Sequence, residues 1–154
     1  MDTKLVRATP HDAQLLWQLQ REAFAGLLST YQDFDTNPAC ETLDRICAKL
    51  EQPFTYFYLI RVGDQTVGAV RIVNKKTAER KRISPLFILP SFRGRGLAQK
   101  AIAMCEDIHG ADNWQLLTIM QEAGNCHLYE KMGYRRTGQT VAVNDRMTLV
   151  VYEK

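Results

Sequence analysis

The stretch Leu86-Phe87-Ile88-Leu89-Pro90-Ser91-Phe92-Arg93-Gly94-Arg95-Gly96-Leu97-Ala98 decides the fold of this chain of 154 residues. Its apolar start predicts the end of a strand, and the spacing of apolar residues after Gly96 predicts a helix. The Arg/Gly turn between them aims consecutive backbone N–H groups at one point, beside the positive end of the helix dipole. Gly94 and Gly96 allow the backbone to approach an anion closely, and Arg93 and Arg95 add positive charge. The stretch therefore predicts either a pyrophosphate cradle or a solvated basic turn.

Two common phosphate loops do not fit this turn. No third glycine follows Gly96 at the spacing of a dinucleotide-binding loop, and no Gly-Lys-Ser/Thr follows as in a Walker loop. The choice between the cradle and the solvated turn therefore depends on the rest of the chain.

A second motif lies downstream, at Leu128-Tyr129-Glu130-Lys131-Met132-Gly133-Tyr134. It resembles the Leu-Tyr-Glu-Lys-x-Gly-Phe/Tyr signature of the GNAT N-acetyltransferase superfamily. Arg93-Gly94-Arg95-Gly96-Leu97-Ala98 resembles the acetyl-CoA signature of the same superfamily. The N-terminal part is similar to a group of bacterial members in Gln20-Arg21-Glu22-Ala23-Phe24, Tyr31-Gln32-Asp33 and Asn37-Pro38. The resemblance covers essentially the whole chain.

Length and composition agree with one globular domain over residues 1–154. Hydrophobic residues make up 45% and charged residues 24% of the chain, and the net charge of +3 excludes few kinds of partner. No apolar run approaches the roughly 18 residues of a membrane span, and the N-terminus does not read as a signal peptide. We therefore expect a cytoplasmic protein without a membrane partner.

The four cysteines do not have the spacing of a metal site or a disulfide framework. Cys40, Cys47 and Cys105 recur at helical spacing among apolar residues, which predicts small core side chains. Cys126 is expected to begin a helix, where a thiol can become reactive, although an inert small residue is the favoured interpretation. We expect no metal.

Hydrophobic periodicity predicts an α/β domain on a mixed sheet. Because a helix connects the strands at 82–89 and 114–120, these two strands are expected to be parallel. Pro85 within a strand indicates a bulge or an edge. The expected helices are 10–28, about 38–50, 96–109 and 125–132, and the expected strands are 4–8, 54–62, 66–73, 82–89, 114–120, 134–143 and 147–152.

The resemblance implies how such a fold would bind acetyl-CoA. The two parallel strands splay into a V, pantetheine pairs with the strand that ends in Ile88 and Leu89, and a bulge on that strand frees N–H groups for the thioester carbonyl. The pyrophosphate rests on the amides of Arg93, Gly94, Arg95, Gly96, Leu97 and Ala98. Tyr129 would be the general acid that protonates the departing thiolate; alternatively, it is a core aromatic residue.

One position departs from the family pattern. Many members carry asparagine seven residues before the tyrosine, where the side chain contacts the cofactor, but this chain has Glu122 there. Asn125 is therefore expected to cap the helix, to contact CoA, or both. Glu122 is one candidate for the general base.

The acceptor site is less defined by the sequence. Glu22, Asp33 and Asp35 lie in the region that commonly walls the acceptor in this superfamily, and each is also a candidate base or a plain surface carboxylate. With Phe24 and Tyr31 they predict a pocket with acidic and aromatic walls.

The sequence thus predicts a metal-free N-acetyltransferase that moves the acetyl group of acetyl-CoA directly to a primary amine of a small molecule or protein. Its oligomeric state, monomer or homodimer, stays open. One alternative is a non-catalytic acyl-CoA-binding sensor with the same fold. Another is an RNA-associated module that uses the basic run from Lys75 to Arg82 and the Arg93/Arg95 turn, although the run contains no aromatic residue for base stacking.

Overall fold

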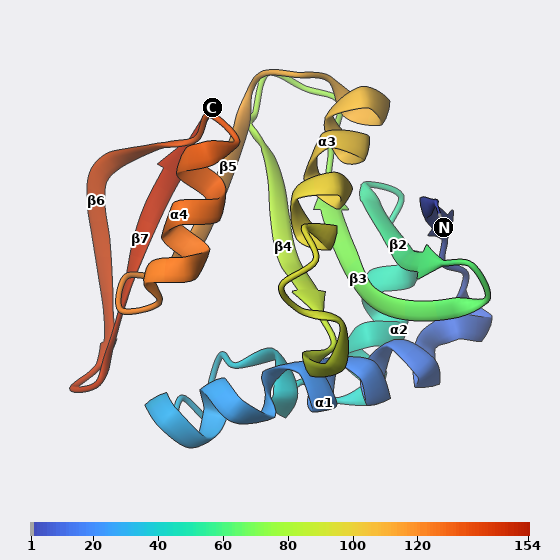
Figure 1. Ribbon diagram of the computed structural model, residues 1–154, viewed down its shortest axis with the longest axis horizontal. Helices are drawn as coiled ribbons and strands as arrows, with labels where there is room; N and C mark the ends of the chain where they lie inside the picture. Colours follow the sequence, from blue (N-terminus) through green and yellow to red (C-terminus); the bar gives the residue numbers. More distant parts are fainter. Residues whose placement is uncertain (1) are drawn as a thin grey trace.

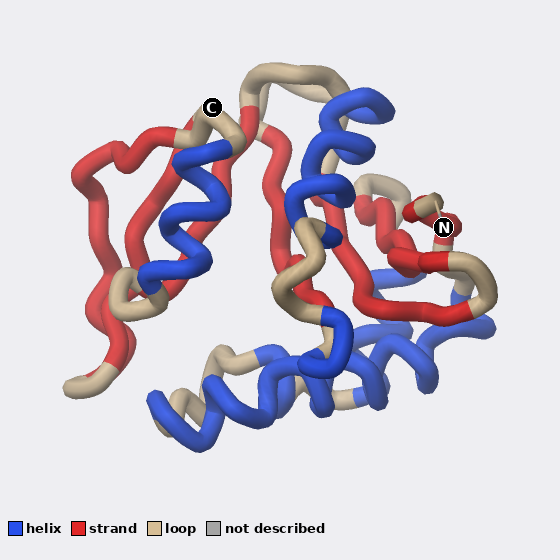
Figure 2. The backbone as a smooth tube through the Cα atoms, in the orientation of Figure 1, coloured by secondary structure: helices blue, strands red, loops and turns tan. Residues whose placement is uncertain are grey.

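The computed structural model describes residues 2–154 and contains one seven-stranded sheet in the order β1-β2-β3-β4-β5-β7-β6. Helices lie on both sides of this sheet (Figures 1 and 2). This arrangement confirms the predicted α/β domain on a mixed sheet. The strands are β1 (Thr3–Arg7), β2 (Thr55–Val62), β3 (Gln65–Val73), β4 (Lys81–Ile88), β5 (Trp114–Ile119), β6 (Arg135–Asn144) and β7 (Met147–Glu153), and the helices are α1 (Ala13–Tyr31), α2 (Leu43–Glu51), α3 (Leu97–His109) and α4 (Ala123–Lys131).

Short 3-10 turns precede the two N-terminal helices. The backbone N–H of Thr9 donates to Asp12 at 2.8 Å, and a 3-10 turn over Pro10–Asp12 precedes α1. Asn37 caps a separate 3-10 turn, whereas α2 is capped by Thr42, whose hydroxyl accepts from the N–H of Arg45 at 3.2 Å. The predicted start of the second helix was therefore about five residues early.

Strands β4 and β5 are parallel, as predicted, but they pair over only two positions. Lys81 lies opposite Trp114 and Arg82 opposite Gln115, and no further pairs join these strands. Figure 1 shows the two strands close together at one end and separating toward the other. The other edge of β5 pairs with β7. The splay expected from the family resemblance is therefore present.

The predicted bulge is present on β4. Ile72 of β3 pairs with Ile83, and Val70 pairs with Leu86, so Ser84 and Pro85 together face Arg71. Proline has no backbone N–H, so its place at a bulge leaves no ladder donor unsatisfied. The Nη1 of Arg71 donates to the Ser84 carbonyl at 3.0 Å. A buried side chain thus supplies a hydrogen bond where the strand pairing is interrupted.

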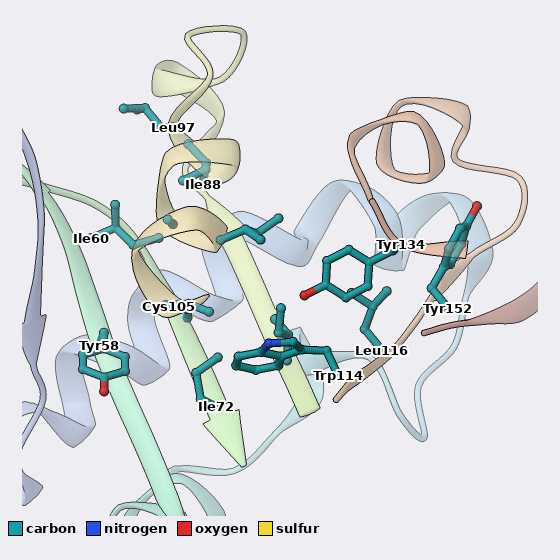
Figure 3. Packing of buried hydrophobic residues seen from close by; sticks show 14 of the residues in the cluster. Tyr58, Ile60, Ile72, Ile88, Leu97, Cys105, Trp114, Leu116, Tyr134 and Tyr152 are labelled. Carbon is teal, nitrogen blue, oxygen red and sulfur yellow. The ribbon is translucent and has the colours of Figure 1, made fainter. Parts of the chain in front are cut away.

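Two apolar cores lie on the two faces of the sheet. The one beneath α1 and α2 includes Leu16, Ile46 and Phe57, and the one beneath α3 and α4 includes Ile102 and Trp114. Trp114 is fully buried, and its indole N–H donates to the Gly110 carbonyl at 2.8 Å. In Figure 3 its ring lies beside Leu116 at the base of the splay. Trp114 therefore packs where β4 and β5 are still joined.

The burial of the cysteines agrees only in part with the prediction. Cys105 is buried as predicted, whereas Cys47 is half-buried and Cys40 is exposed, so the prediction for Cys40 was wrong. Helix α4 begins at Ala123, before the predicted start at Asn125, and ends at Lys131. Gly133 follows two residues later with a φ of 92°. None of the helices in residues 2–154 combines the length and apolar composition needed to cross a membrane.

We predict that Trp114→Ala lowers the free energy of unfolding by about 3–5 kcal/mol, since it removes a large side chain from a closed core. Urea denaturation measures this change. Ile108→Ala is the control, because Ile108 on α3 is 56% exposed, and its substitution should change the stability by no more than about 0.5 kcal/mol. Equal losses in the two variants would contradict the role given to Trp114.

Candidate functional site

A cavity of about 570 Å³ lies at the open end of the splay. It is walled by the second half of α1, the end of β4, the turn before α3, the start of α3, and α4 (Figure 1). The structure brings most of the predicted site residues to this one place. Those that line the cavity are Phe24, Ile88, Arg93, Gly94, Gly96, Leu97, Ala98, Glu122, Asn125 and Tyr129.

The turn before α3 presents a row of open backbone donors. Among the residues of the described chain, none accepts a hydrogen bond from the N–H groups of residues 94–99, whereas Lys100 N–H donates to Gly96 at 3.1 Å. Gly94 and Gly96 have φ angles of 79° and 73°, which residues with a Cβ rarely adopt. Helix α3 has no side-chain cap at its N-terminus. Its open donors and dipole make this end of the cavity an anion site.

The two arginines of the turn differ from each other. The Nε of Arg93 donates to the Ile88 carbonyl at 2.9 Å, and its Nη2 donates to the Ala23 carbonyl of α1 at 2.8 Å. This guanidinium therefore holds the turn against β4 and α1. Arg93 also lines the cavity, so its positive charge lies beside the open donors. Arg95 is exposed with its guanidinium 5.5 Å from the centre of the Phe92 ring, and it does not line the cavity.

The end of β4 offers unpaired backbone groups to the cavity, but not at every predicted position. The Leu89 N–H donates to Val67 at 2.8 Å and its carbonyl accepts from Phe92 at 3.0 Å, so both of its backbone groups are occupied. Because successive residues of a strand point their backbone groups in opposite directions, Leu86 and Ile88 face the gap toward β5. Leu86 therefore takes the place that the sequence analysis gave to Leu89.

Tyr129 lies on α4 and lines the cavity, half-buried. Its ring packs against Tyr134 and Tyr152 at centroid distances of 6.1 and 6.3 Å. Burial, with a smaller contribution from Cys126, raises the pKa of Tyr129 to about 12. Its hydroxyl has no hydrogen-bond partner within residues 2–154, so a protonated phenol remains available to a ligand.

Glu122 and Tyr31 form a direct pair at the cavity wall. The Tyr31 hydroxyl donates to the Oε2 of Glu122 at 2.5 Å, and this hydrogen bond, with burial and the negative charge of Glu122, raises the pKa of Tyr31 to about 12. Asn144, at the tip of the β6–β7 hairpin, donates from Nδ2 to the Tyr31 carbonyl at 3.0 Å. The pair thus joins the end of α1, the start of α4 and the hairpin tip.

Asn125 lies in the first turn of α4, after Glu122 at the N-cap position. Its side chain makes no hydrogen bond to the rest of the described chain, although it lines the cavity. The capping role considered for Asn125 is therefore not found, and a ligand contact remains open to it.

Of the remaining predicted residues, Phe24 lines the cavity, whereas Glu22 and Asp33 do not. The Phe24 ring lies in the cavity wall, 5.6 Å from the Phe87 ring. Glu22 is exposed and does not line the cavity. Asp33 is buried, where its carboxylate accepts from the Thr36 hydroxyl and from the backbone N–H groups of Thr36 and Asp35. Asp33 therefore closes the loop after α1 and is not available to an acceptor.

Cys126 is also a structural residue. It is 5% exposed, and its thiol donates weakly to the Ile119 and Met120 carbonyls at 3.7 and 3.9 Å. It stands inside α4 rather than at its start. A buried thiol in this position fits the inert interpretation.

Helix α1 contributes more to the cavity than the sequence predicts, since Phe24 was expected there but its neighbours on the helix were not. Ala23 and Leu27 line the cavity together with Phe24. These two residues share the apolar face of the helix, and that periodicity does not distinguish a core from a cavity wall. Leu86 was missed because a strand's pairing partner determines which of its groups are free.

No group of three or more potential metal ligands occurs in the part of the chain that the structure describes. The site therefore consists of an anion-binding turn, an open strand edge, a protonated phenol and a carboxylate.

The family model of the acetyltransferase (GNAT) domain matches residues 14–154. No protein with a curated description matches the chain. Among solved structures, an acetyltransferase from Thermus thermophilus is 21% identical with a TM-score of 0.70, over 99% of this chain and 96% of that one. Spermidine N-acetyltransferase from Vibrio cholerae, solved with CoA and spermine, is 15% identical with a TM-score of 0.77, over 97% and 93%.

The ribosomal-protein-S18-alanine N-acetyltransferase from Escherichia coli is 9% identical with a TM-score of 0.74, over 98% of this chain and 92% of that one. At these identities the solved structures show the shared fold alone. The family model, which matches nearly the whole chain, shows more: the protein belongs to the GNAT family of acetyltransferases.

Proposed function

We propose that the protein transfers the acetyl group of acetyl-CoA directly to the nitrogen of a primary amine. The observation that carries this proposal is the row of open N–H donors at residues 94–99, at one end of a cavity that also contains an open strand edge and Tyr129. CoA has a matching order of groups, with its phosphates at one end and its thiol at the other.

The cavity supports binding of CoA in one direction. The pyrophosphate lies on the donors of residues 94–99, and Arg95 adds positive charge from the rim. The amides of pantetheine then pair with the free backbone groups of Leu86 and with the N–H of Ile88, whose carbonyl already accepts from Arg93, as an added strand would. This direction brings the thioester toward the β4 bulge and α4. The structure of the Vibrio cholerae spermidine N-acetyltransferase, which contains CoA, supports the choice of cofactor.

Tyr129 is the proposed general acid. The amine nitrogen attacks the thioester carbon, the carbon–sulfur bond breaks, and the thiolate takes the phenolic proton. A pKa of about 12 keeps the hydroxyl protonated near neutral pH, but it makes the phenol a weak donor toward a thiolate. Its contribution is therefore greatest as a hydrogen bond that strengthens while negative charge develops on sulfur.

Glu122 is the proposed general base, since it is the only carboxylate that lines the cavity within the described residues. An aliphatic ammonium with a pKa near 10 is only about one part in a thousand free amine at pH 7, so a proton acceptor assists the reaction. The Tyr31 hydroxyl fixes one carboxylate oxygen. The second oxygen remains to take the proton of the amine.

We predict that Gly96→Glu weakens acetyl-CoA binding by at least about 100-fold, because like charges about 4 Å apart repel by several kcal/mol even near a protein surface. Calorimetric titration measures the affinity. Gly138→Glu is the matched control: Gly138 lies on β6, also has a positive φ and has no atom within 4 Å of an added Cβ. It should bind acetyl-CoA normally, and unchanged binding by Gly96→Glu would reject the phosphate cradle.

We predict that Tyr129→Phe lowers kcat by about 100-fold or more while acetyl-CoA affinity is retained, since only the proton donor is lost. Release of free thiol measures turnover, and calorimetry measures binding. Tyr56→Phe is the control, because Tyr56 lies on β2, away from the cavity. Full activity of Tyr129→Phe would assign the acid role elsewhere, and binding without turnover by the unmodified protein would indicate an acyl-CoA sensor.

We predict that Glu122→Gln lowers kcat/KM by about 100-fold near pH 7, with a deficit that shrinks toward pH 10 as the amine loses its proton without help. Glu51→Gln, at the end of α2, should behave like the unmodified protein at each pH. A deficit for Glu122→Gln that is constant across the pH range would indicate a role in binding and not in proton removal.

A further inference from the structure

A second hollow, of about 230 Å³, lies on the far side of the β4 bulge. It is lined by the loop that connects α1 to α2, by the side of α2, and by Ser84 and Pro85 of the bulge. The next residues of β4, Leu86 and Phe87, line the main cavity. One short segment of strand therefore borders both spaces.

The wall of this hollow carries four charged side chains. Two of them neutralise each other, since Lys49 Nζ lies 2.5 Å from Glu41 Oε2. The side chains of Asp35 and Arg45 form no hydrogen bond or ion pair with the rest of residues 2–154, and both residues are exposed. One carboxylate and one guanidinium are thus left for a ligand.

Two buried side chains behind the wall each contain one polar atom without a hydrogen-bond partner. Gln20 is 1% exposed; its amide nitrogen donates to Pro38 and Glu41 of the wall, but its Oε1 accepts no hydrogen bond within the described chain. Arg71 is 9% exposed; it donates to the carbonyl of Ser84 in the wall and, at 3.4 Å, to Gln52 Oε1 and the Thr55 hydroxyl, but its Nε has no partner. Buried unpaired polar atoms are rare in native proteins. Two of the three in residues 2–154 belong to these side chains, which bond to residues of the wall.

Arg71 also places an uncompensated positive charge at this point. No carboxylate lies within ion-pair distance of it in residues 2–154, and burial lowers its pKa, although Glu41 acts in the opposite direction. A buried cation is stabilised by an anion nearby. Since the wall itself is balanced, the hollow with Arg71 behind it has a net positive charge that suits one ligand carboxylate.

We propose that this hollow binds the acceptor, and that the acceptor is a small amine that also carries a carboxylate, of which an amino acid is the simplest case. Arg45 contacts the carboxylate, with Arg71 behind, and the amine extends past the bulge toward Glu122 in the main cavity. The amine then lies beside the bulge, next to the segment of β4 that faces the thioester. This assignment rests on the proposed acetyl transfer and adds the class of acceptor to it.

The test compares acceptors that differ in one group. Free amino acids, their carboxamides and the corresponding decarboxylated amines are offered with acetyl-CoA, and thiol release gives kcat and KM. A charge-assisted hydrogen bond predicts a KM about 10- to 100-fold lower for the free acids. Arg45→Gln should remove this preference, whereas Arg135→Gln, an exposed arginine on β6, should retain it.

Binding of the products separates failure of this inference from failure of the proposed function. Calorimetry measures the affinity for N-acetyl amino acids and for the N-acetylated decarboxylated amines, which needs no turnover. Tighter binding of the acids that depends on Arg45 supports the hollow as a carboxylate site, even if no amine is acetylated. Equal KM values and equal product affinities across the pairs would overturn the inference while leaving acetyl transfer intact.

Discussion

The brief pairing of β4 with β5 is the constraint on which the rest of the structure depends. The two strands share hydrogen bonds only at Lys81–Trp114 and Arg82–Gln115, and β5 then continues along β7 instead. Buried backbone groups that lack a partner are costly, so an open strand edge inside a domain needs water or a ligand. The splay therefore creates, from backbone alone, a place where an extended ligand with amide groups can replace a missing strand.

The two ends of the main cavity then acquire opposite chemistry. At one end, the N-terminus of α3 leaves the donors of residues 94–99 open, because Arg93 turns its charge inward to Ile88 and Ala23 and the two glycines keep the turn free of side chains. At the other end, Glu122 is fixed by Tyr31. In the proposed reaction, the first end holds the anionic part of the donor and the second accepts a proton from the cationic acceptor.

Most elements could be predicted from the sequence because their signals are local. The capping box at Thr9, the Gly63-Asp64 turn and the closing Gly133 each act within a few residues. Contacts between distant segments left no such signal: Tyr31 and Glu122 are 91 positions apart, and β7 inserts between β5 and β6. For the same reason the sequence could not show which of Leu86 and Leu89 has free backbone groups.

The bulge on β4 explains why the two spaces can meet at one strand. In a regular ladder Ser84 would pair with β3 and β4 would stay straight. At the bulge, Ser84 and Pro85 together lie opposite Arg71, and β4 bends there. Pro85 adds no donor that needs a partner, and Arg71 satisfies the exposed carbonyl of Ser84. A neutral donor could make the same hydrogen bond without the cost of burying a charge. The guanidinium, however, also donates to Gln52 and to the Thr55 hydroxyl at 3.4 Å, so one arginine ties the bulge to β2 and to the end of α2, and its charge suits the anion proposed to bind beside the bulge.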